Sequence, residues 1–304
     1  MPQPDHIFIV GLGRTGSTLT RSILNCSPEV GIGGESHYFR DLPRLGSRSS
    51  RSFRSKLARA GNLKTDAGAR AVVAMIFGKH PRHDNFWNLT AKGVDRAEFL
   101  NNLLASDRSE RALFDLAMAY HAGGKPVRGE KTPAHIYFVP ELLEWFPNSK
   151  VIHTFRDPRA IFMSRKKKAE KKNLSFFSRV VRKLGLVFEL ISSLHLITNW
   201  LRVARLHRQY QQRFPNRYIL SHYEDLVCDP AGSLRDLCAF LEIEFSEAML
   251  EQSVVNSSFV QKDQVVAGFD IGAIDRWREH MDPLLKRWFL FWCKKELDDF
   301  DYAA

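Results

Sequence analysis

A short, continuous apolar run at residues 7–10 ends in glycines, and this pattern predicts a strand buried on both faces of a parallel sheet. Two further strands are predicted at residues 150–155 and 217–221. Helical spacing between them predicts helices at about 16–26, 133–146, 231–241 and 283–297, with a further helix opening at Pro158. Because strands alternate with helices, we predict an α/β fold, a doubly wound parallel sheet with helical insertions.

Two stretches fall outside this alternation. Residues 66–121 have mostly helical spacing, with breaks near Pro81 and Gly93. Residues 45–56 are rich in serine and arginine and have no periodicity, so we predict an exposed loop there. The chain contains no internal repeat, and residues 1–304 are interpreted as a single domain.

The composition is that of an ordinary globular protein. With 44% hydrophobic and 26% charged residues among 304, disorder, a coiled coil and low-complexity structure are excluded. No apolar run reaches the roughly 18 to 20 residues that span a bilayer, and the first residues lack a basic segment, so we expect a cytoplasmic protein without a signal peptide. The cysteines are far apart and no histidines cluster beside them, which argues against a zinc site or a disulfide framework. They are Cys26, Cys228, Cys238 and Cys293.

The net charge of +11 is the unusual feature of the composition, and two segments carry it. Residues 165–183 hold nine Lys and Arg against one acidic residue, and residues 40–59 hold seven against one. The remainder of the chain is mildly acidic. A basic excess indicates a polyanionic partner such as nucleic acid, an anionic membrane or a phosphate-rich cosubstrate.

The first basic segment continues into apolar positions at helical spacing, so we predict a basic amphipathic helical insertion at about 165–200. The apolar positions are Phe176, Phe177, Val180, Val181, Leu184, Phe188, Ile191 and Leu194. Three interpretations stay open: a solvated helix whose apolar face packs on the domain, peripheral contact with an anionic membrane, and a lid or dimer contact over the binding site. The loop at 45–56 is interpreted either as an electropositive gate for the acceptor or as an unstructured segment.

Residues 11–18 join the first strand to the first helix and form a candidate phosphate loop. Glycines at this junction let backbone N–H groups turn toward an anion at the helix N-terminus. The loop fits the GxGxxG dinucleotide pattern, with Glu35 near the distance expected of a ribose-binding acid. It also fits the triphosphate loop, except that Ser17 replaces the lysine. The residues expected to hold the anion are Gly13, Arg14, Thr15, Gly16, Ser17 and Thr18.

A second anion site is predicted where the strand at 150–155 ends. Arg156 lies at the carboxyl end of that strand, and Ser164 lies one to two turns into the following helix. Ligands of open α/β sheets bind at this edge, so the two side chains can grip one phosphate together.

With both sites in this order, the chain resembles the sulfotransferases that use 3′-phosphoadenosine 5′-phosphosulfate. In that family a loop like Arg14 to Thr18 holds the 5′-phosphosulfate, and a segment like Arg156 to Ser164 holds the 3′-phosphate. Further matches, which cover most of residues 6–280 and resemble the carbohydrate and tyrosylprotein branches, follow in the family's order. They are Gly34 to Ser36, Gly129 to Pro133, Tyr223 to Leu226 with Asp229 and Pro230, and Gly272 to Trp277.

The resemblance implies a role for each matching residue. Glu35 is the expected catalytic base, while Arg14 and Lys131 offset charge on the transferred group. Tyr223, Arg276 and Trp277 are expected beside the nucleotide. Small-molecule members carry a histidine base two residues after the lysine, where this chain has Pro133. The base is therefore assigned to Glu35, with His37 and His135 as substitutes.

The sequence predicts an enzyme that transfers a sulfuryl group from 3′-phosphoadenosine 5′-phosphosulfate to a hydroxyl acceptor, which is a sugar, a glycolipid, a tyrosine or a small alcohol. Neither a metal nor a nucleic acid partner is expected, and peripheral membrane contact is assigned to residues 165–200. Two alternatives stay open. They are a P-loop kinase or other nucleotide-dependent phosphotransferase, and a non-catalytic basic protein that binds membranes.

Overall fold

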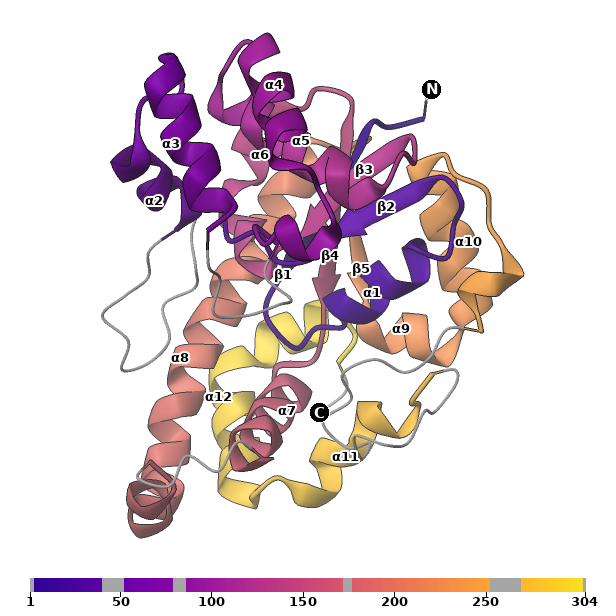
Figure 1. Cartoon of the computed structure of the whole chain (residues 1–304). Helices are drawn as coiled ribbons and strands as arrows, with labels where there is room; N and C mark the ends of the chain where they lie inside the picture. The colour runs from indigo at the N-terminus through magenta and orange to yellow at the C-terminus, as the bar shows by residue number, and fades with distance from the viewer. Residues whose placement is uncertain (1–2, 40–51, 79–85, 172–176, 252–268, 303–304) are drawn as a thin grey trace.

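The computed structural model describes residues 3–39, 52–78, 86–171, 177–251 and 269–302, without the side chains of residues 170–184. Within these residues, a five-stranded parallel sheet has the strand order β2-β3-β1-β4-β5 (Figure 1). The strands are β1 His6–Gly11, β2 Val30–Gly33, β3 Val127–Lys131, β4 Ser149–Phe155 and β5 Tyr218–His222. The prediction of an α/β fold with a parallel sheet and helical insertions is confirmed.

Strand β1 lies in the middle of the sheet. Its first residue, His6, is aligned with Arg128 of β3 on one side and with Ser149 of β4 on the other. All residues of β1 are buried. Because successive side chains of a strand point to opposite faces, Ile7 joins one core cluster and Phe8 joins the other.

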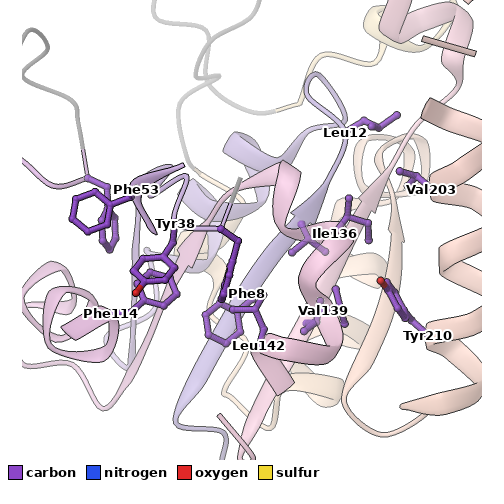
Figure 2. Close-up of a cluster of buried hydrophobic side chains, with 14 of the residues drawn as sticks. Phe8, Leu12, Tyr38, Phe53, Phe114, Ile136, Val139, Leu142, Val203 and Tyr210 are labelled. Atoms are coloured by element: carbon purple, nitrogen blue, oxygen red, sulfur yellow. The ribbon is translucent and has the colours of Figure 1, made fainter. Parts of the chain in front are cut away.

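Helices cover both faces of the sheet (Figure 1). The face of Ile7 packs against α1 Ser17–Leu24, α9 Tyr223–Cys228 and α10 Pro230–Leu241. The opposite face packs against α5 Glu110–Ala122, α6 Val139–Trp145, α8 Phe177–Arg213 and α12 Pro283–Asp299. Figure 2 shows Phe8 in this larger cluster beside Leu142, with Tyr38 and Phe114 nearby. Burial on both faces explains why Ile7 to Val10 of β1 are apolar without alternation.

The region predicted to be helical at 66–121 consists of several short elements. They are α3 Asp66–Ile76, η1 Thr90–Lys92, α4 Arg96–Ala105 and α5. Side chains of Thr65, Asp95 and Ser109 accept backbone N–H groups at the starts of α3, α4 and α5, which satisfies part of each helix end. Gly93 ends η1, so the predicted break there is confirmed, whereas Pro81 lies outside the described residues.

The remaining elements flank the strand ends. They are α2 Phe53–Ala60, η2 Pro133–Phe138, α7 Pro158–Lys171, η3 Glu247–Met249 and α11 Gly272–His280. The predicted helix at 133–146 is divided into η2 and α6, because Pro140 lies at the start of a new helix. Pro158 opens α7 as predicted.

The prediction of an exposed loop at 45–56 is wrong for its last residues. Residues 45–51 lie outside the described part of the chain, but Ser52 caps α2 and residues 53–56 are helical. Phe53 is buried and stacks on Trp87, with ring centroids 3.5 Å apart. Arg54 pairs with Glu110 and Glu141, so its charge is balanced within the fold. These long-range contacts stabilise the start of α2, and local sequence periodicity does not reveal them.

The prediction of one helical insertion at about 165–200 is also corrected. Two helices cover this region: α7 begins earlier, at Pro158, and α8 continues to Arg213. Gly185 breaks the regular geometry of α8 with a φ of 42°, a conformation that glycine adopts most easily. The later part of α8 extends because its side chains, Trp200 among them, are buried against the sheet. None of the described helices has the length and hydropathy of a membrane span.

Candidate active site

The candidate site lies where the carboxyl ends of the strands meet. Since the described strands run parallel, the residues that end or follow them gather at one edge of the sheet. These residues are Arg14 after β1, Glu35 after β2, Lys131 at the end of β3, Arg156 after β4 and Tyr223 after β5. Most of the residues singled out from the sequence therefore share this edge.

The phosphate loop owes its shape to Gly16. This residue precedes α1 in the left-handed region, with a φ of 89°, and no side chain caps the helix. A Cβ atom added to Gly16 would lie 2.6 Å from the ring of Tyr223, so a larger residue has no room. The backbone N–H groups at the start of α1 are thus available to an anion.

The loop side chains divide into those that face the anion site and those that hold the loop. Arg14 Nε donates to Ser164 Oγ over 2.9 Å, which joins the two predicted anion sites. Thr15 is buried and bonds to the carbonyl of Leu12 and to Thr154 of β4, so it anchors the loop to the sheet. Ser17 is buried in the first turn of α1, and Thr18 is half-buried next to it. Gly13 lies between Leu12 and Arg14 on the loop, also half-buried.

Arg156 is held from three sides. Its guanidinium donates to the carbonyls of Arg14 and Ala273, and it lies 3.9 Å from the ring centroid of Tyr223. Its Nε is buried without a hydrogen-bond partner among the described residues. A buried donor without a partner is costly, and an anion at this place would satisfy it.

Glu35 and Lys131 form an ion pair next to this anion site. Lys131 Nζ lies 2.5 Å from one Glu35 carboxylate oxygen, and His37 Nε2 lies 3.3 Å from the other. Burial raises the pKa of Glu35, but the His37 and Lys131 contacts outweigh it and lower the pKa to about 2. Glu35 is therefore ionised at neutral pH and able to accept a proton, while its side chain stays 41% exposed.

The structure rules against His135 as a substitute base. Its side chain is completely buried. Its Nδ1 lies 2.6 Å from Glu130, and its Nε2 accepts the backbone N–H of Phe39. Both ring nitrogens are used inside the protein, so His135 cannot reach an acceptor hydroxyl. His37 remains next to Glu35 and is 41% exposed.

Arg276 and Trp277 on α11 occupy different environments. Arg276 pairs with Asp270 and lies near Tyr223. Burial raises the pKa of Tyr223, although the charges of Arg156 and Arg276 act against this rise. Trp277 is 4% exposed in the larger core cluster, with the Arg159 guanidinium 3.9 Å from its ring centroid. Trp277 also lines a cavity of about 260 Å³ together with Asp157, Glu224 and Tyr302. The structure thus brings Arg276 close to the anion site and packs Trp277 in the core.

Two further arginines close to the site were not singled out from the sequence. Arg165 Nη2 donates to the carbonyl of Gly13 over 3.4 Å, and burial together with the charge of Arg14 lowers the pKa of Arg165 to about 10. Arg21 of α1 has a buried Nε without a partner among the described residues. Burial lowers the pKa of Arg21, and the charge of Glu35 opposes this shift. The available signal for Arg165 was its position directly after Ser164, but the residue was counted with the basic excess.

These side chains form a group of cations beside a carboxylate. Arg14, Arg156 and Arg165 can neutralise a multiply charged anion, and Glu35 can take a proton from a group bound next to it. Among the described residues, no cluster of three or more His, Cys, Asp and Glu side chains is arranged to hold a metal ion.

Comparison with known proteins gives a consistent result. A family model described as the sulfotransferase family matches residues 4–247. Protein-tyrosine sulfotransferase A of Caenorhabditis elegans is 26% identical over 279 residues, which are 89% of this chain and 60% of that protein. The Drosophila melanogaster protein-tyrosine sulfotransferase is 24% identical, over 89% of this chain and 46% of that protein. The chain therefore spans about half to three fifths of the length of these relatives.

Solved structures resemble the fold. The sulfotransferase domain of the Synechococcus PCC 7002 olefin synthase matches with a TM-score of 0.57 and 18% identity, over 100% of this chain and 97% of that domain. The sulfotransferase domain from the curacin biosynthetic pathway matches with a TM-score of 0.56 and 18% identity, over 100% of this chain and 99% of that domain. Because the family model matches well over half of its residues, the chain belongs to the sulfotransferase family.

Proposed function

We propose that this protein transfers a sulfuryl group from 3′-phosphoadenosine 5′-phosphosulfate to a hydroxyl acceptor. The observation that carries the proposal is the junction of the two predicted anion sites, where Arg14 bonds to Ser164 beside the Glu35–Lys131 pair. Family membership supports the same activity. A kinase is disfavoured because Ser17 stands where a triphosphate loop has its lysine.

The residues at the site fit such a donor. Arg156 has a buried Nε without a partner among the described residues, and the start of α1 has no side-chain cap. An anionic group is the ligand that satisfies both features. We assign the loop at Gly13 to Thr18 to the phosphosulfate end, and Arg156 with Ser164 to the 3′-phosphate. When bound, the donor supplies an activated sulfuryl group on a phosphate leaving group.

The side chains around the donor position have separate tasks. Arg14 and Lys131 offset the negative charge that grows during in-line transfer, as in phosphoryl transfer. Glu35 accepts the proton of the acceptor hydroxyl. A carboxylate with a pKa of about 2 is a weak base, and its partner Lys131 is part of the cause. A substrate anion that binds beside Lys131 offsets part of its charge, which raises the pKa of Glu35 and makes it a better base.

For the acceptor, we propose the tyrosyl hydroxyl as the first class to test. Several relatives that match most of this chain are named protein-tyrosine sulfotransferases. Sugars, glycolipids and small alcohols are the other hydroxyl acceptors that the sequence left open. Incubation with ³⁵S-labelled donor and separate peptide, sugar and lipid fractions of a cell extract identifies the class that becomes labelled.

Ligand binding distinguishes the proposal from its alternatives. We expect adenosine 3′,5′-bisphosphate to raise the melting temperature and ATP with magnesium to leave it unchanged, because only the bisphosphate carries the 3′-phosphate. Stabilisation by magnesium ATP alone would support a phosphotransferase instead. No stabilisation by either nucleotide would support a non-catalytic protein.

We infer in addition that the exposed face of α8 contacts an anionic membrane. Val187, Ile191 and Leu194 follow one another at helical spacing and are 58%, 57% and 36% exposed. This supports membrane contact over packing of these residues on the domain. Vesicles with phosphatidylserine should retain the protein, and Ile191→Asp should release it, while phosphatidylcholine vesicles should retain neither.

A further inference from the structure

A buried hydrogen-bond network lies directly behind the Glu35–Lys131 pair. Its members are Glu130 within β3, Thr132 just after β3, Ser36 after β2, and His135 of η2. All are almost or completely buried. Each of the two site residues has a neighbour in the network: Ser36 follows Glu35, and Glu130 precedes Lys131.

Glu130 is the centre of the network. One carboxylate oxygen accepts from Ser36 Oγ over 3.0 Å and from the hydroxyl of Thr132. The other oxygen lies 2.6 Å from His135 Nδ1. Thr132 Oγ1 in turn accepts the backbone N–H of Ser36 over 2.9 Å, so Ser36 is bonded to both Glu130 and Thr132.

The partners of His135 fix its tautomer. A backbone amide can only donate, and the N–H of Phe39 donates to His135 Nε2 over 3.3 Å. The ring proton therefore sits on Nδ1 and points to Glu130. All side-chain partners of Glu130 that the structure gives are donors, which suits a carboxylate and no neutral amide.

We propose that Glu130 is a positioning residue that fixes Glu35 and Lys131 against each other through its bonds to Ser36, Thr132 and His135. This inference rests on the proposed function. Glu130 is completely buried and does not reach the acceptor. Its contribution is geometric, because loss of one bond lets the segments after β2 and β3 separate and lengthens the Glu35–Lys131 contact.

The first test is Glu130→Gln, which keeps the size of the side chain but presents an amide N–H to donors. We expect kcat to fall about 10- to 100-fold, because small displacements of reacting groups have effects of this size. The KM for the donor and the Kd for adenosine 3′,5′-bisphosphate should stay within about twofold, since Arg14 and Arg156 are untouched. Equal losses in kcat and nucleotide affinity would overturn the proposal.

The matched control is Asp115→Asn. Asp115 forms a carboxylate–histidine contact with His6 over 2.8 Å, at the amino end of β1 and away from the site. It should lower the melting temperature without changing kcat. If both variants lower kcat equally, Glu130 has only a structural role.

Thr132 gives a second test should Glu130→Gln fail to fold. Thr132→Val removes the hydroxyl from the network, and Thr132→Ser keeps it. We expect Thr132→Val to lower kcat and Thr132→Ser to retain it. Equal kcat values for the two variants would contradict the proposal.

A double variant separates this inference from the proposed function. If Glu130 acts through Glu35, then Glu130→Gln combined with Glu35→Gln has the kcat of Glu35→Gln alone. If the fold-losses in kcat of the two single variants multiply in the double variant, Glu130 acts independently of Glu35. If Glu35→Gln alone retains kcat, Glu35 is not the base and the proposed role of Glu35 fails, whatever Glu130 does.

Discussion

The Nζ atom of Lys131 lies 2.5 Å from a carboxylate oxygen of Glu35. The lysine is 6% exposed and the glutamate 41%, so the cation is fixed inside the protein while the carboxylate faces solvent. This asymmetry suits a site in which one partner stays and the other meets the acceptor.

Removing the charge of Lys131 should change the pKa of Glu35 by a measurable amount. In Lys131→Met we expect the pKa of Glu35 to rise from about 2 toward its ordinary 4.5, because burial then opposes ionisation with only His37 to counter it. Carbon-13 NMR of labelled glutamate carboxyls measures the change.

Lys150→Met is the control for this prediction, since Lys150 pairs with Glu242 instead. It should leave the pKa of Glu35 unchanged. A Glu35 pKa that stays near 2 without Lys131 would contradict the electrostatic coupling.

Arg156→Ala should weaken binding of adenosine 3′,5′-bisphosphate by about 1.5 to 3 kcal/mol, the range for a hydrogen bond to a charged group. Isothermal titration calorimetry measures the loss. Arg217→Ala is the control, because Arg217 donates to the carbonyls of Leu143 and Pro147, far from the loop. Unchanged affinity in Arg156→Ala would exclude Arg156 from the 3′-phosphate site.

Arg165→Met should act in opposite directions on the free and bound protein. Removing a buried charge beside Arg14 should leave the melting temperature of the free protein equal or higher. The rise produced by adenosine 3′,5′-bisphosphate should shrink, because one cation next to Gly13 is lost. Arg205→Met, an exposed site on α8, should change neither quantity. A full nucleotide effect in Arg165→Met would remove Arg165 from the donor site.

Glu224 should make stability depend on pH. Burial raises its pKa to about 7 against the contacts with Asp157 and Arg156, so the folded protein holds a proton that the unfolded chain releases above about pH 4.5. The resulting loss of folding stability is absent below about pH 4.5 and complete above about pH 7. The free energy of unfolding of Glu224→Gln, relative to that of the original protein, should therefore rise by about 1 to 3 kcal/mol from pH 5 to pH 8. Urea unfolding at both pH values gives this difference, and a constant difference would contradict the assignment.

The sequence predicts the central part of the fold because its signals are local. β1 contains the unbroken apolar run Ile7 to Val10, β4 carries Val151, Ile152 and Phe155 among polar residues, and the loop at Gly16 follows a strand directly. β3 was not predicted from the hydrophobic pattern, because Arg128, Glu130 and Lys131 occupy three of its five positions. A strand that carries functional charges into the interior breaks the hydrophobic pattern at the place where the function lies.

The residues of the site were predicted unevenly for the same reason. Arg14, Arg156 and Ser164 belong to recognisable segments, and the structure brings them together. Arg165 was counted with the basic run at 165–183, although it directly follows Ser164, and the structure shows that it turns back to Gly13. The burial of His135 and its bond to Glu130 depend on how η2 packs, which one sequence does not report.

The contact of Gly16 with Tyr223 also has a consequence for folding. The two residues are separated by most of the chain, yet the ring of Tyr223 leaves no room for a side chain at Gly16. Contacts of such high sequence separation require closure of a long loop and slow the formation of the native state. During synthesis the phosphate loop leaves the ribosome before Tyr223 does, so its contact with the Tyr223 ring forms only after β5 and α9 have been made. We therefore expect nucleotide to stabilise the completed protein and not its amino-terminal half.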